Sequence, residues 1–204
     1  MKTSFIFVVI WLPLHALSQG HLQFNNFTEG LAPVTISSTP GTFNPADGLA
    51  GAYVGSDYAA SLFYVLGTVT NQTVFDNSNP TWVTAVDARF FGTTGTGSGH
   101  GWDGDGSGFF DGGVARFNFA LTTATFQVRV WNNGGGLYTS YEQAASGGHN
   151  VGQSNLLPLF VDAPPGPAPG LSGLMPFTVG IPEPSTFVLA ALGGAALFFF
   201  RRRK

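Results

Sequence analysis

The stretch ATFQVRVW, residues 124–131, alternates strictly between two kinds of side chain. One set of positions is apolar and consists of Ala124, Phe126, Val128 and Val130. The other set begins with Thr125 and ends with Trp131. A period of two places successive side chains on opposite faces of a strand. We therefore predict a half-buried strand in which Phe126 and Val128 face the core and Gln127 and Arg129 face solvent.

Further segments with strand character lie on both sides of this stretch, and no long amphipathic helix is predicted. They are residues 22–27, 60–69, 82–91, 109–110, 114–121 and 155–161, with a turn at 111–113 and a short helical turn at 138–145. Polar turns rich in glycine, proline and asparagine separate them, and residues 71–80 are predicted as one such loop. Short strands in this number are typical of an all-β protein, and we predict a single β-sandwich-like domain.

Composition limits the chemistry of this domain. The chain has 204 residues and no cysteine, which excludes disulfide bonds and thiolate metal sites. Five of its eight cations lie at the two ends, so the body keeps only Arg89, Arg116 and Arg129 against ten acidic residues, a net charge of −7. Such a surface does not attract nucleic acid or anionic lipid.

The N-terminal residues 1–18 have the pattern of a signal peptide. Lys2 precedes an apolar run at residues 5–14, and the small residues Ala16 and Ser18 predict cleavage before Gln19. An uncleaved N-terminal anchor is the alternative. His21 follows directly and is not predicted to be functional.

The C-terminal residues 181–204 form a second targeting pattern. Pro182, Glu183 and Pro184 precede an uncharged run at residues 186–200, and the chain ends on Arg201, Arg202, Arg203 and Lys204. As a helix the uncharged run would span about 22 Å, short of a hydrocarbon core of about 30 Å but workable with local thinning. The terminal cations would stay cytoplasmic. An ordinary C-terminal membrane anchor is the alternative.

The Pro-Glu-Pro motif, the short apolar helix and the arginine cluster together resemble the PEP-CTERM sorting signal of Gram-negative bacteria. The resemblance implies that an exosortase cleaves near Pro182–Pro184, after transient anchoring in the inner membrane. The protein would then pass to the cell surface or the exopolysaccharide matrix. The motifs FQVRVW (126–131), YEQA (141–144) and GQSN (152–155), with residues 58–67 and 108–113, resemble a pattern shared by many uncharacterised PEP-CTERM proteins. That pattern brings no established activity with it.

A proline- and glycine-rich segment precedes the sorting signal. Residues 164–170 read PPGPAPG, a composition that favours an extended spacer. The predicted organisation is therefore a signal peptide (1–18), an exported β-sandwich domain (19–162), a linker (163–180) and the sorting signal (181–204).

A glycine-rich loop carries the most suggestive pattern for a metal. Oxygen donors at loop positions 1, 3, 5 and 9 resemble a Ca²⁺ loop, with Gly108 at position 6: they are Asp103, Asp105, Ser107 and Asp111. Position 12 should be a bidentate Glu but is Val114. We expect weak Ca²⁺ binding or a plain glycine-rich hairpin, and no other cofactor.

Other candidate side chains are few. Trp131, on the polar face of its strand, and Trp102, in a loop, are candidates for stacking on sugar rings, although packing is the usual role of such residues. His100 and His149 are expected to be exposed loop residues. No Gly-x-Ser-x-Gly elbow or cysteine nucleophile is available, and the body holds only Glu29 and Glu142 as glutamates, so no catalytic residues are assigned.

These patterns predict an exported, non-enzymatic protein with a structural or adhesive role at the cell surface or in the matrix. The first alternative is a carbohydrate-binding module of the extracellular matrix. The second is a secreted hydrolase, which the small number of suitable residues disfavours.

Overall fold

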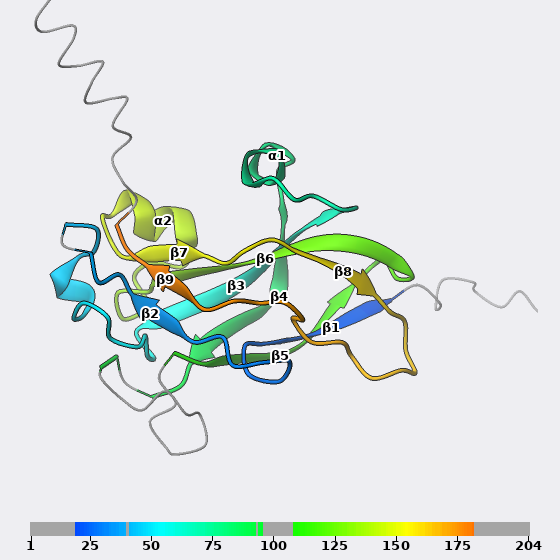
Figure 1. Ribbon diagram of the computed structural model, residues 1–204, viewed down its shortest axis with the longest axis horizontal. Coiled ribbons are helices and arrows are strands. Elements are labelled where there is room, and N and C mark those ends of the chain that lie inside the picture. Colours follow the sequence, from blue (N-terminus) through cyan, green and yellow to red (C-terminus); the bar gives the residue numbers. More distant parts are fainter. Residues whose placement is uncertain (1–18, 40, 93, 96–107, 182–204) are drawn as a thin grey trace, which may run out of the picture.

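The protein is described by a computed structural model for residues 19–39, 41–92, 94–95 and 108–181, with only the backbone for residues 84–87. It consists mainly of strands (Figure 1). These are β1 (Gly20–Asn25), β2 (Val34–Ile36), β3 (Tyr58–Leu66), β4 (Thr81–Phe90), β5 (Phe110–Phe117), β6 (Thr122–Asn132), β7 (Val151–Gln153), β8 (Leu157–Val161) and β9 (Phe177–Val179). The helical elements are η2 (Pro45–Asp47), α1 (Gln72–Asn77) and α2 (Tyr141–Ser146).

Seven of the strands form one curled sheet. Their order is β1-β5-β4-β3-β6-β7, and β8 also pairs with β6. The sheet curls far enough for β1 to meet the end of β8, where the His21 amide donates to the Asp162 carbonyl at 3.3 Å. The remaining strands, β2 and β9, form a small parallel sheet. The predicted all-β class is confirmed, but one curled sheet with a small second sheet replaces the expected sandwich.

Strand β6 is the centre of the fold. It pairs with β3 over nine residues and with both β7 and β8 on its other edge. Phe126 and Val128 are fully buried in the main core, as the alternation predicts. Truncating such a side chain typically costs several kcal/mol, so these residues are major contributors to stability.

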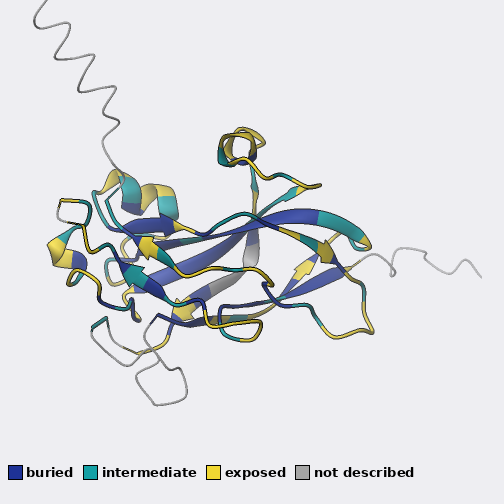
Figure 2. Ribbon diagram, in the orientation of Figure 1, coloured by how far each residue is buried: buried dark blue, intermediate teal, exposed yellow. Residues whose placement is uncertain are grey.

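The opposite face of β6 is also covered, and here the prediction was wrong. Gln127 is fully buried, and its amide nitrogen donates to Oε1 of Gln72 at 2.8 Å and to the Ser154 carbonyl at 3.2 Å. Arg129 is only 11% exposed. Helices α1 and α2 lie over this side of the sheet (Figure 1), and most of β3 and β6 is buried (Figure 2).

The helix α1 occupies the segment that was predicted as a polar loop. Asn71 caps it, because its side-chain oxygen accepts from the Val74 amide at 3.2 Å. Asp76, in the last turn of α1, pairs with Arg129 at 2.8 Å. The polar residues of this segment therefore form a capped helical turn, and the Asp76 carboxylate of that turn contacts Arg129 of the sheet.

The predicted hairpin turn at residues 111–113 does not form. Residues 110–117 are one strand, β5, which pairs with β1. The register shifts between Gln23 and Asn25, whose partners are Val114 and Asp111, so two residues of β5 stand opposite one of β1. This is a β-bulge, and Gly113, with a φ of 71°, supplies the backbone conformation that it needs.

The segment predicted as a linker is part of the folded unit. The Gln23 amide donates to the Pro169 carbonyl at 2.7 Å, and Leu171 is buried. Strand β9 then pairs with β2, which buries Val179 in the main core. A few apolar side chains among the prolines and glycines supply this packing, so the domain continues to Ile181 instead of ending near Asp162.

Candidate functional site

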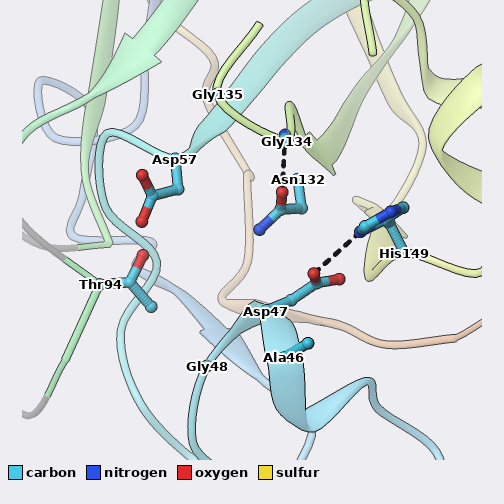
Figure 3. A pocket seen from close by; sticks show the side chains of 9 residues that line it. All are labelled: Ala46, Asp47, Gly48, Asp57, Thr94, Asn132, Gly134, Gly135 and His149. Carbon is cyan, nitrogen blue, oxygen red and sulfur yellow. Dashed lines mark hydrogen bonds and ion pairs between the residues drawn. The ribbon is translucent and has the colours of Figure 1, made fainter. Parts of the chain in front are cut away.

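A polar cavity of about 450 Å³ lies between η2, the start of β3, the end of β6 and the loop before β7 (Figure 3). The residues that line it are mostly polar or glycine: Ala46, Asp47, Gly48, Asp57, Thr94, Asn132, Gly134, Gly135 and His149. They come from distant parts of the chain, so the cavity exists only when the sheet has folded.

An Asp–His pair forms one wall of the cavity. The Asp47 carboxylate lies 2.9 Å from Nδ1 of His149, and its second oxygen accepts from the Asn150 amide at 2.7 Å. An ionised carboxylate only accepts hydrogen bonds, so Nδ1 of His149 carries the proton in this contact. The Asp47 side chain is 4% exposed and the His149 side chain 22% exposed, which leaves the imidazole as the more accessible partner.

A buried network holds Asp47 in place from behind. The Tyr58 hydroxyl donates to the Asp47 carbonyl at 3.1 Å and accepts from the Asn150 amide nitrogen at 3.3 Å. The side-chain oxygen of Asn150 accepts from the Asn44 amide at 2.6 Å. Burial raises the pKa of Tyr58 to about 12, so this hydroxyl remains a proton donor throughout the physiological range.

His149 is also fixed by an aromatic contact. Its ring lies 4.4 Å from the ring of Tyr138, centroid to centroid. The indole nitrogen of Trp131 in turn donates to the Tyr138 carbonyl at 3.0 Å. Trp131 is 3% exposed, so the expectation that it offers its face to a sugar is wrong. It packs with Ala59, Ala144 and Val151 beneath α2 and fixes Tyr138.

This arrangement suits the recognition of a polar, uncharged molecule. The exposed carboxylate of Asp57 is able to accept hydrogen bonds from hydroxyl groups, and the imidazole of His149, which Asp47 holds in place, adds a further polar contact. Tyr138 also lines a neighbouring shallow hollow, together with the exposed Leu137. The described residues contain no cluster of three or more side chains placed to hold a metal ion.

Comparison with known protein families matches residues 180–204 to the PEP-CTERM protein-sorting motif. This is a PEP-CTERM domain-containing protein. The motif implies export, sorting to the cell envelope and processing by an exosortase. No curated protein and no solved structure matches the chain.

Most of the site residues predicted for this PEP-CTERM protein lie outside the described residues. These are the sorting-signal residues Pro182, Glu183, Pro184, Arg201, Arg202 and Arg203, the loop residues Asp103, Asp105 and Ser107, and Trp102. Asp111 is described: it is exposed in β5, and its carboxylate accepts from the Gly113 amide at 2.8 Å.

The polar cavity of the PEP-CTERM protein was not predicted. His149 was considered only as a loop residue, and Asp47 was not considered. The two are 102 residues apart, and no spacing rule connects them. Asn44-Pro45 is recognisable as a turn signal, but its partner across the fold is not.

Helices in the described part of the PEP-CTERM protein are short. Neither α1 nor α2 exceeds six residues, and no described helix is long and apolar enough to cross a bilayer. The predicted spanning segment, residues 186–200, lies outside the described residues.

Proposed function

We propose that the protein is an exported, non-catalytic component of the outer cell surface or the exopolysaccharide matrix, with a structural or adhesive role. The observation that carries this proposal is the position of the sorting motif. The motif begins at residue 180, and the last strand, β9, ends at Val179. Cleavage near Pro182–Pro184 would therefore leave all described strands intact.

In this proposal the two ends act only during export. Residues 1–18 direct the chain across the inner membrane and are removed before Gln19. Residues 186–200 hold it there transiently, with Arg201–Lys204 on the cytoplasmic side, until an exosortase releases the domain. The released protein keeps the acidic body, which favours solubility over adsorption to anionic lipid.

Mass spectrometry of protein recovered from the native host tests the proposed processing. We expect an N-terminus near Gln19 and a C-terminus between Pro182 and Pro184. A variant with Pro182, Glu183 and Pro184 all changed to alanine should keep its C-terminus and remain in the membrane fraction. Recovery of intact Arg201–Lys204 from the outer surface would contradict the proposal.

Carbohydrate binding is the second candidate, and the polar cavity favours it. Asp57 and the Nε2 of His149 offer hydrogen-bond acceptors, Asp47 holds the imidazole in place, and Tyr138 adds an aromatic surface at the side. The two carboxylates favour a neutral sugar over an acidic one, since they would repel a bound carboxylate.

A glycan-binding screen on residues 19–181 separates an adhesive role through sugars from a purely structural role. Both hydrophobic clusters lie within these residues, so the fragment retains the described packing. We expect Asp57→Ala to weaken binding of any neutral glycan, and Asp111→Ala, an exposed acid outside the cavity, to leave it unchanged. Turnover of a polysaccharide by the same protein would instead support the hydrolase alternative.

A further inference from the structure

A second cavity, of about 290 Å³, lies between β1, β5 and the segment that follows β8. Its walls include His21, Val114, Arg116, Pro164 and Pro165. Strands β1 and β8 lie at one end of the molecule, and β2, β9 and α2 lie at the other (Figure 1). This cavity is therefore distinct from the polar cavity around Asp47 and His149.

The imidazole of His21 has an unmet hydrogen bond. The residue is 6% exposed, and its Nε2 lies 3.1 Å from the Gly166 carbonyl. A carbonyl only accepts, so Nε2 carries the proton. Nδ1 is buried and has no hydrogen-bond partner. Buried polar atoms are rarely left unpartnered because the cost is about 1–3 kcal/mol. Because His21 lines the adjoining cavity, a shift of its ring that exposes Nδ1 would let a group bound there supply the missing partner.

Arg116 supplies a positive charge beside His21. The two residues are direct cross-strand partners in the β1–β5 pairing. The His21 amide points away from β5, toward the Asp162 carbonyl, so this is a pair of the type whose side chains lie closest together. Arg116 is exposed and has no ion pair among the described residues. The Asp162 carboxylate, just after β8, accepts from the Ala163 amide at 2.8 Å.

The remaining walls are apolar. Pro164, Pro165 and Val114 present rings and methyl groups, which suit the C–H face of a sugar ring. A ligand that fits all three surfaces carries a carboxylate for the guanidinium, a hydroxyl for Nδ1 and a ring for the prolines. The bidentate geometry of an arginine–carboxylate pair makes the first of these contacts the strongest.

We propose that this cavity binds a carboxylate-bearing sugar, a uronic acid, with its carboxylate on Arg116 and a hydroxyl donating to Nδ1 of His21. The proposal does not depend on the polar cavity, whose carboxylates disfavour an acidic ligand. It gives the two ends of the domain opposite preferences: neutral sugars near His149 and acidic sugars near His21.

Nuclear magnetic resonance of the His21 imidazole in residues 19–181 tests the proposal directly. Glucuronate is titrated, with glucose and acetate as matched probes that lack the carboxylate and the sugar ring. We expect a saturable shift of the His21 nitrogen resonances with glucuronate alone. Equal shifts with glucose or with acetate at the same concentrations would overturn the proposal, as would no shift with glucuronate.

Two variants complete the test. Arg116→Ala should weaken glucuronate binding at least about tenfold, because a charge-assisted hydrogen bond is lost. Arg89→Ala removes an exposed arginine of β4 outside the cavity and should leave the affinity unchanged. His21→Phe keeps a ring in place and should also weaken binding. Unchanged affinity in Arg116→Ala would overturn the proposal even if His21→Phe failed to fold.

Discussion

The carboxylate of Asp47 holds the imidazole of His149 across 102 residues of chain, at a distance of 2.9 Å. Asp47 ends η2, and His149 lies in the loop between α2 and β7. The contact therefore joins the segment before β3 to the segment after β6. It fixes the orientation of the imidazole and also holds these two segments together at one end of the sheet.

Replacing Asp47 by alanine should destabilise the domain by about 3 kcal/mol. The change removes the charged acceptor for both the His149 imidazole and the Asn150 amide and leaves two partly buried donors without a partner. Asp57→Ala, an exposed acid on the same cavity, is the matched control and should cost less than about 0.5 kcal/mol. Urea unfolding of residues 19–181 measures both. Equal losses would mean that the Asp47 contacts contribute no stability beyond that of a surface acid.

Gln127→Ala should cost about 1–3 kcal/mol, although the alternation in the sequence places Gln127 on the solvent side. Its amide donates to Gln72 and to the Ser154 carbonyl, and truncation leaves these acceptors unsatisfied in a buried place. Gln153→Ala, an exposed glutamine of the neighbouring strand β7, should cost less than about 0.5 kcal/mol. Thermal or urea unfolding compares the two variants. A loss below that of Gln153→Ala would show that α1 does not cover this face.

Arg129 should stabilise the folded state more through its contacts with two aromatic rings than through its ion pairs. Its guanidinium lies 4.6 Å from the Phe63 ring centre and 5.5 Å from that of Tyr141, whereas the paired Asp76 is 45% exposed. We expect Arg129→Ala to cost about 2 kcal/mol, with a coupling energy to Asp76→Ala below about 1 kcal/mol in a double-mutant cycle. A coupling as large as the whole Arg129→Ala loss would reverse this assignment.

Stability should fall in alkaline solution because of Tyr58. Burial raises the folded-state pKa of this phenol from 10.0 to about 12, so the folded state favours the neutral form. The contribution is fully present below pH 10 and is lost as the pH rises toward 12, by up to about 2–3 kcal/mol. Urea unfolding at a series of pH values should show a shallower fall in Tyr58→Phe than in the parent. Burial also raises the pKa of Tyr141, so part of the fall should remain. A fall in unfolding free energy of the same size in Tyr58→Phe and in the parent would contradict this assignment.

Because the folded domain continues to Ile181, truncation at residue 162 should abolish cooperative unfolding. A protein of residues 19–181 should unfold cooperatively, whereas residues 19–162 should lose the cooperative transition. The shorter protein lacks β9 and exposes the apolar side chains of Val34 and Ile36, which pair with it. Circular dichroism during heating compares the two. Coincident melting curves would show that residues 163–181 are the spacer that the sequence suggests.

The sequence predicted local features well because they depend on neighbouring residues. The alternation in β6 correctly placed Phe126 and Val128 in the core, but β2, β7 and β9 were not predicted, and the turn predicted at residues 111–113 lies inside β5. It could not reveal that Gln127 is covered, because the covering helix α1 comes from another part of the chain. The apolar residues of β9 were hidden in a segment dominated by proline and glycine. The Asp47–His149 pair depends on the complete topology of the sheet.

The parallel pairing of β2 with β9 has a consequence for the timing of folding. A chain that emerges N-terminus first presents Val34–Ile36 early and Phe177–Val179 almost last. The hydrogen bonds of β2 to residues 51–54 can form early, as in the Ile36 amide donating to the Ala52 carbonyl at 2.8 Å, whereas its pairing with β9 must wait until residues 177–179 arrive. The sorting motif begins at residue 180, directly after β9, so the strand that completes the β2 pairing is the last one before the motif. The last strand in the chain therefore completes the domain.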